Sequence, residues 1–179
     1  MAGLRDRLQW NEGRIADGPR RYLMMRPDVL MGALAPLPAA TRYSVLQAWA
    51  AAAERYGGDS LRAYARSLGP GQEESLLQTT AEAAADLGWG RWSLRREGDV
   101  LQLQVHGSPF VAGWRAAVSG APGAVDAFGT APGAVCAPVQ GLLAALAEAV
   151  LGAPVQATEL HCAAQHGGES CRFEARRSA

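Results

Sequence analysis

The three cysteines of this chain all lie in its last third, together with a glutamate at short spacing. Glu159 stands three residues before Cys162, a glycine-containing polar turn separates Cys162 from Cys171, and Cys136 lies further upstream. Thiolate sulfur and carboxylate oxygen both bind zinc, and four such ligands complete a closed tetrahedral site. The set predicts a structural metal site; the alternative is three reduced, partly buried thiols.

The spacing of Glu159 and Cys162 restricts the backbone between them. Side chains of a strand alternate between its two faces, so residues three apart point in opposite directions. The backbone must therefore turn or bulge between these two residues if both are to reach one ion.

Apolar periodicity divides the middle of the chain into helices and hairpins. We expect helices over 39–56, stopped by Gly57-Gly58, then from Asp59 to Gly69-Pro70, over 72–88, and from Pro132 in a first turn to about Leu151. We expect hairpins of 89–96 with 100–106 and of 155–162 with 171–176. The predicted fold class is α/β in the α+β sense, an antiparallel sheet packed with helices.

The N-terminal residues 1–18 are polar and predict a flexible or dimer-exchanging arm, followed by a short strand over 21–26. We expect residues 19–179 to form a single domain, because one domain is the default for 179 residues. The segment 116–130 has no clear period and predicts a mobile loop or lid.

Charge and composition exclude several classes of function. Seventeen basic residues balance seventeen acidic ones, so no nucleic-acid partner is indicated. Every basic residue is arginine, which with the many alanines indicates a GC-rich bacterial genome. There is no apolar run of the ~20 residues needed to span a bilayer, and no leader-like apolar region, so we expect a cytoplasmic protein without a membrane span.

The C-terminal pattern resembles the 4-vinyl-reductase-type, or hydrocarbon-binding, domain family. The resemblance is carried by a helix with Cys136 and Gly141, then Gly152 and an apolar strand, then Glu159-x-x-Cys162, a glycine turn and Cys171-Arg172-Phe173. The family includes a vinyl reductase protein of bacteriochlorophyll biosynthesis and the sensor module of phenol- and xylene-responsive activators. It implies a fold like that of vesicle-tethering TRAPP subunits, and a homodimer.

For the metal site, the resemblance implies structural zinc on Cys136, Glu159, Cys162 and Cys171. The turn between the last two cysteines is a residue longer than usual in the family. This longer turn introduces His166, and both His166 and His161 are alternative ligands for the metal.

A binding pocket is better supported than a catalytic site. The chain has no dinucleotide fingerprint, no lysine for a phosphate-binding loop and no nucleophile elbow, so a non-enzymatic role is favoured and enzymatic activity stays undecided. Aromatic residues flank the central hairpin, where an apolar cavity is expected, although rings of this kind also serve as core. The predicted ligand-binding residues are Arg91, Trp92, Phe110, Trp114 and Ala157.

Three hypotheses for function follow from the resemblance and the pocket. The first is non-enzymatic binding of a hydrophobic ring compound, a tetrapyrrole intermediate of bacteriochlorophyll synthesis, held for or delivered to a partner enzyme of pigment synthesis; an arginine near the pocket suits a propionate. The second is a stand-alone sensor module for aromatic hydrocarbons such as phenols that signals through a separate partner. The weaker third is a protein-interaction subunit with a lipid-filled cavity.

Overall fold

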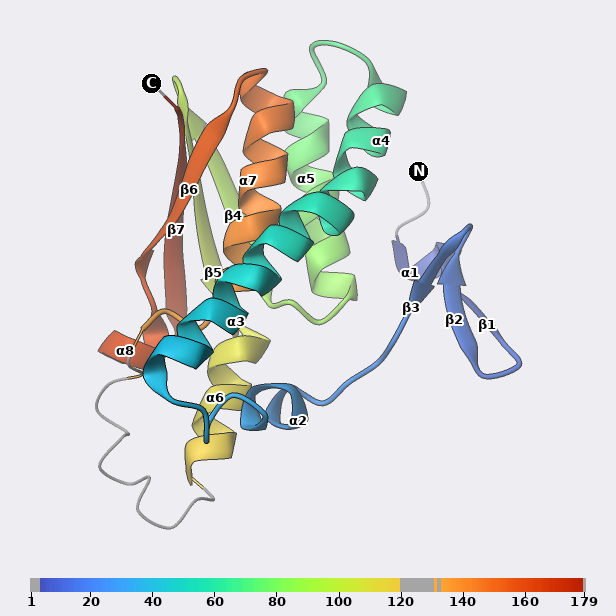
Figure 1. The fold of residues 1–179 in the computed structure, drawn as a ribbon. Helices are drawn as coiled ribbons and strands as arrows, with labels where there is room; N and C mark the ends of the chain where they lie inside the picture. The colour runs from blue at the N-terminus through green and yellow to red at the C-terminus, as the bar shows by residue number, and fades with distance from the viewer. Residues whose placement is uncertain (1–3, 120–130, 132, 179) are drawn as a thin grey trace.

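The computed structural model describes residues 4–119, 131 and 133–178, and its centre is a four-stranded antiparallel sheet. The strands are β4 (Arg91–Glu97), β5 (Val100–His106), β6 (Val155–His161) and β7 (Ser170–Arg177), in the order β4-β5-β7-β6. Helices pack on one face of the sheet (Figure 1). The predicted α+β class and both predicted hairpins are confirmed.

Alternation along the strands separates a buried face from a polar face. Leu101, Leu103 and Val105 of β5 are buried, whereas the residues between them are polar and more exposed. Such a pattern is expected when helices cover only one side of an antiparallel sheet. The buried face rests against α7 (Ala137–Leu151), which contacts both β6 and β7, and against α5 (Glu73–Asp86), which contacts β4.

The glycine pair at 57 and 58 does not stop a helix, contrary to the prediction. A π-helical turn, η1 (Ala53–Gly57), joins α3 (Ala39–Ala52) to α4 (Gly58–Leu68), and both glycines keep right-handed helical backbone angles. A Cβ atom at Gly57 would lie 2.5 Å from the side chain of Leu142, and one at Gly58 would lie 2.6 Å from that of Ala145. The two glycines therefore allow η1 and the start of α4 to pack closely against α7.

Gly141 brings the backbones of α7 and α3 together. A Cβ atom at this position would lie 2.0 Å from the carbonyl oxygen of Ala50, a distance that no side chain can occupy. The close crossing holds the first half of α7 at one end of the sheet, where the cysteines lie.

Helix α7 starts later than predicted. It begins at Ala137, with Cys136 as the residue before its first turn and Pro138 inside that turn. Proline is tolerated there because the first N–H groups of a helix have no partner within it. Pro132, which was predicted for the first turn, lies outside the described residues. The predicted end is confirmed, since Gly152 follows Leu151 with a left-handed φ of 65°.

A helix replaces the first part of the predicted loop. Helix α6 (Pro109–Ser119) includes residues 116–119, and the remaining residues of that prediction, 120–130, lie outside the described part of the chain. α6 packs against α2 (Pro27–Gly32), and a Cβ atom at Gly113 would lie 2.3 Å from the carbonyl oxygen of Pro27. Gly113, which precedes the predicted loop, permits this close contact.

The N-terminal segment forms a short helix and a second, smaller sheet. α1 (Leu4–Arg7) precedes β1 (Gln9–Asn11), β2 (Arg14–Asp17) and β3 (Arg20–Tyr22), which pair in antiparallel order. The strand predicted over 21–26 is thus shorter and ends at residue 22. The small sheet stands away from the main body on an extended segment (Figure 1). No helix in the described ranges has the length and apolar character to cross a membrane.

Candidate metal centre and the adjoining cavity

A β-bulge brings Glu159 and Cys162 to the same side. β6 pairs regularly with β7 up to Glu159, and the register then shifts between Glu159 and His161. Cys162 follows directly as the residue before the short helix α8 (Ala163–His166), which leads back toward β7. The irregularity that the spacing predicted is therefore present, and an extra residue in one strand is its usual cause.

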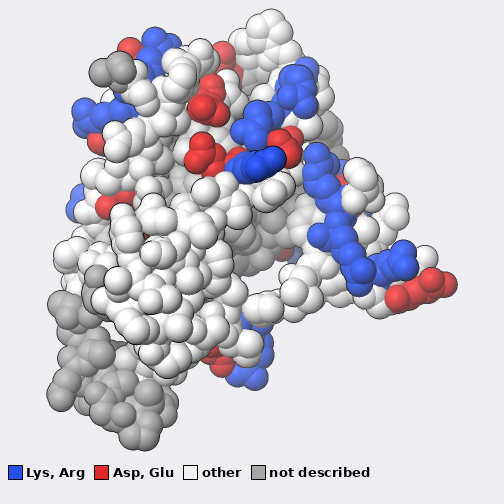
Figure 2. Space-filling model, viewed as in Figure 1, with Lys and Arg blue, Asp and Glu red and all other residues white. Residues whose placement is uncertain are grey.

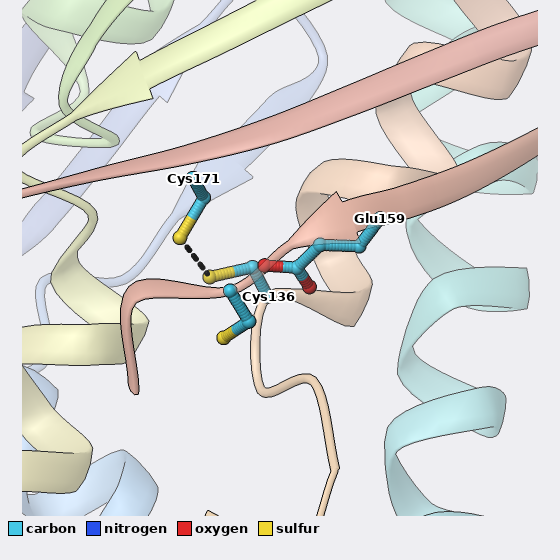
Figure 3. Close-up of side chains that lie close together, drawn as sticks. Cys136, Glu159 and Cys171 are labelled. Carbon is cyan, nitrogen blue, oxygen red and sulfur yellow. Dashed lines mark hydrogen bonds between the residues drawn. The ribbon is translucent and has the colours of Figure 1, made fainter. Parts of the chain in front are cut away.

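The four predicted ligands converge on one point. One ligand atom from each of Cys136, Glu159, Cys162 and Cys171 lies within 4.8 Å of the others. The three cysteines are buried free thiols, and the Sγ atoms of Cys136 and Cys171 are 3.6 Å apart. Figure 3 shows these two sulfur atoms facing each other, with the carboxylate of Glu159 directed to the same space. The N-terminus of α7 and the ends of β6 and β7 thus meet here.

The rival histidines lie outside this group. The rings of His161 and His166 stack on each other with centroids 5.1 Å apart, and His166 is exposed. Neither belongs to the set that can hold a metal among the described residues.

Hydrogen bonds within the cluster and burial raise the pKa of three of its four groups. Desolvation, followed by the charge of Cys162, raises the pKa of Glu159 to about 8. Hydrogen bonds with Cys162 and Cys171, followed by burial, raise the pKa of Cys136 well above its usual range. The hydrogen bond with Cys136 lowers the pKa of Cys171, but its bond with Cys162 and burial outweigh this, and the pKa rises to about 12.

Cys162 is the charged member of the cluster. Hydrogen bonds from the thiols of Cys136 and Cys171 stabilise its thiolate and hold its pKa well below the usual range.

The carboxylate of Glu159 shows that the cluster fits a cation. Both of its oxygen atoms are buried and have no hydrogen-bond partner among the described residues, a condition that is costly unless another group compensates it. Three sulfur donors and one carboxylate oxygen are the ligand types of a closed structural site. These four residues can therefore hold a metal ion.

A cavity adjoins the metal centre and shares a wall with it. Its volume is about 470 Å³, and its lining residues come from β4, β5, α6 and the α8 to β7 turn: Arg91, His106, Gly107, Ser108, Val111, Ala112, Arg115, Ala163, Glu169 and Cys171. Cys171 is thus both a candidate metal ligand and part of the wall. The hydroxyl of Ser108, which is 4% exposed, lies 3.2 Å from the Sγ atom of Cys136.

Of the five predicted ligand residues, Arg91 lies on the wall of this cavity. Trp92, Phe110 and Trp114 are buried in the hydrophobic core, and Ala157 is packed against that core from β6. Phe110 and Trp114 are four residues apart on α6, whereas the cavity is lined by other residues of the same helix. None of these four lines the cavity described here.

Sequence reasoning missed four polar residues of the wall: His106, Ser108, Arg115 and Glu169. Arg115 connects α6 to the segment between Cys162 and Cys171. Its Nη2 atom donates to the carbonyl oxygens of Ala163 at 2.9 Å and of Gly168 at 3.0 Å. No local pattern marks these residues, since they meet only when α6 docks against the loop after β6.

The arrangement is that of the sensory and 4-vinyl-reductase-like α+β fold, and comparison with solved structures confirms the predicted resemblance at the level of fold. The phenol-responsive sensory domain of the transcription activator PoxR, solved with phenol, matches 97% of this chain and 86% of its own at 18% identity, with a TM-score of 0.75. A vinyl-4-reductase family protein from Methanocaldococcus jannaschii matches 88% of this chain and 98% of its own at 10% identity, with a TM-score of 0.50. Comparisons of the sequence with family models and with curated proteins find no match.

Proposed function

We propose that this chain is a non-enzymatic sensory domain that binds a small aromatic compound of the phenol class. The observation that carries the proposal is the likeness of nearly the whole chain to a phenol-responsive sensory domain. A cavity of about 470 Å³ supports it, since this is within the usual range of ligand pockets, about 300–1,000 Å³. Arg91 contacts the ligand in this proposal; ligand contacts by Trp92, Phe110, Trp114 and Ala157 stay a prediction.

A tetrapyrrole is the second candidate ligand. The observation in its favour is the pair of arginines, Arg91 and Arg115, on the wall of the cavity, because a guanidinium group suits the propionate of a tetrapyrrole. In this alternative the domain holds a pigment intermediate or delivers it to a partner enzyme.

Titration of the purified chain with ligands separates the two candidates. Phenol and a magnesium porphyrin are added separately while heat release and porphyrin absorbance are followed. The first proposal expects saturable binding of phenol and no spectral shift of the porphyrin. A shift at micromolar porphyrin without phenol binding would instead establish the second candidate.

We further propose that the metal at Cys136, Glu159, Cys162 and Cys171 is structural zinc. The donor set supports this, because three thiolates and a carboxylate fill all four positions of a tetrahedral zinc site and leave none for a reacting water. The ion would join the start of α7 to the ends of β6 and β7, and so fix the wall that Cys171 shares with the cavity. Metal analysis of the purified protein tests this, with one zinc per chain as the expected result.

We also propose that two copies of the chain form a homodimer through the N-terminal sheet. Trp10 pairs with Ile15, and Ile15 pairs with Tyr22, so these three apolar side chains form one row on one face of the sheet. No residue of β1, β2 or β3 is buried, and Trp10 is 65% exposed. A small sheet needs its apolar face packed to be stable, and a second copy of the chain is the occupant that we propose.

The opposite face of the small sheet gives a matched control for the dimer. Figure 2 shows arginine side chains over this N-terminal sheet. By register, Arg14 and Arg21 share the face of Gln9, opposite Trp10, and like charges on that face disfavour contact with a second copy. Trp10→Ser is expected to convert the dimer to a monomer in sedimentation equilibrium, whereas Gln9→Ser, on the other face, leaves it intact. A wild-type chain that is monomeric at micromolar concentration would refute the dimer.

A further inference from the structure

Within the described part of the chain, the wall of the cavity carries more arginines than carboxylates. Among the described lining residues, Arg91 and Arg115 are positively charged, His106 lies beside them, and Glu169 is the one carboxylate. A neutral ring compound needs apolar walls with a few polar groups to orient it. Two guanidinium groups exceed that need, and they indicate a ligand that carries a negative charge.

The position of Arg91 is set by the backbone. Arg91 lies directly opposite His106 in the β4–β5 ladder, so both side chains leave the sheet on the same face. The preceding Gly90 has a φ of 93°, and a Cβ atom there would lie 2.6 Å from the carbonyl oxygen of His106. Only glycine allows this close approach, which places Arg91 at the end of the sheet where α6 begins.

The guanidinium of Arg91 has no partner among the described residues. Over residues 4–119, 131 and 133–178, no hydrogen bond, ion pair or ring contact involves its side chain, whereas the neighbouring outward Arg95 pairs with Glu97 at 3.0 Å. A guanidinium group offers five N–H donors in a planar fork that matches a carboxylate. Arg91 is thus a free donor group on the wall of a cavity.

Arg115 faces the same space from the other side of the cavity. Its Nη2 atom is engaged by the carbonyl oxygens of Ala163 and Gly168, which fixes the plane of the guanidinium. Among the described residues, its Nε and Nη1 atoms have no partner. Two arginines from different elements, β4 and α6, can therefore act on one ligand.

We propose that the ligand of this cavity carries a carboxylate, held by Arg91 with Arg115 in support, so that aromatic acids bind better than neutral phenols. This rests on the proposed function and narrows its ligand class. Glu169 reduces the net positive charge of the wall, and both arginines are exposed. The expected preference is therefore about fivefold, since ion pairs in contact with solvent are screened.

Isothermal titration of the full chain with benzoate and with phenol at low ionic strength tests the proposal. Benzoate is expected to bind about fivefold more tightly, with the difference shrinking as salt is added. Arg91→Gln should remove the preference, because it should weaken benzoate binding about fivefold more than phenol binding. Arg95→Gln, on the same face of the same strand, is the matched control and should keep the preference.

The possible results distinguish a failure of the carboxylate proposal from a failure of the phenol proposal. If phenol binds as well as benzoate, or if Arg91→Gln weakens both equally, the carboxylate proposal is wrong and the phenol proposal stands. A third titration with protoporphyrin IX, which carries two propionates, identifies the source of the carboxylate. Binding of the porphyrin alone with the same dependence on Arg91 supports the carboxylate and the tetrapyrrole. No binding of any of the three overturns both proposals.

Discussion

Metal binding should release about three protons from the cluster at pH 7. Each thiol and carboxyl group must lose its proton to become a ligand. The pKa of Glu159 is about 8 and those of Cys136 and Cys171 are raised, so these three groups are protonated at pH 7 in the metal-free protein. The lowered pKa of Cys162 makes it a thiolate already.

The sign and the size of the pH dependence follow from this count. Raised pKa values mean that protons compete with the metal, so the apparent affinity rises with pH. Three protons correspond to a gain of about three orders of magnitude in affinity per pH unit below pH 8.

Calorimetric titration of the metal-free protein with zinc, in buffers that differ in ionisation enthalpy, measures the number of protons released. Glu159→Gln removes one of them and should lower the number to about two, and it should weaken binding as well. Glu82→Gln, an exposed carboxylate on α5, is the matched control and should release three. Release of one proton or none by the wild-type chain would refute this account of the cluster.

Two further substitutions test the packing and the support of the site. Gly141→Ala should lower the free energy of unfolding by about 1–3 kcal/mol or more, because its Cβ would overlap a carbonyl oxygen of α3. In the control Gly32→Ala a Cβ meets its nearest neighbour at 3.8 Å, so the free energy of unfolding should stay within about 1 kcal/mol of the wild-type value in urea unfolding. Ser108→Ala removes the hydroxyl beside Cys136 and should weaken metal binding about tenfold in competition with a chelator, whereas Ser93→Ala, exposed on β4, should not. If the test variant and the control variant of either pair had the same effect, the structural explanation for that pair would be wrong.

The candidate metal centre was the part of this protein whose convergence the sequence indicated best. The set has three thiols and one carboxyl group, and the three-residue interval between Glu159 and Cys162 required the irregularity that the β6–β7 ladder contains if both were to reach one point. The hairpin of β4 and β5 was equally predictable, because polar and apolar residues alternate on both sides of a glycine turn at Gly98.

Glycine was the main source of error. Gly57 indicated a helix end, yet it lies within a helical segment that approaches the side chain of Leu142. Local propensity records only the low intrinsic helix preference of glycine. The benefit of a close contact depends on which helix lies opposite, and that is a tertiary property.

The cavity could be predicted only in part, for the same reason. Arg91 was identified beside the aromatic residues, but Arg115 and Glu169 are separated by more than fifty positions and share the wall only because α6 docks against the turn before β7.

The strand order of the main sheet has a consequence for how the chain acquires its structure. β7 is the last strand in sequence, yet it occupies an interior position between β5 and β6. The hairpin of β4 and β5 can assemble from local contacts, whereas β7 must find β5 across some seventy intervening residues, and pairings of that separation form slowly. In a pulsed hydrogen-exchange experiment during refolding, amides of the first hairpin should therefore gain protection before those of Ser170–Arg177.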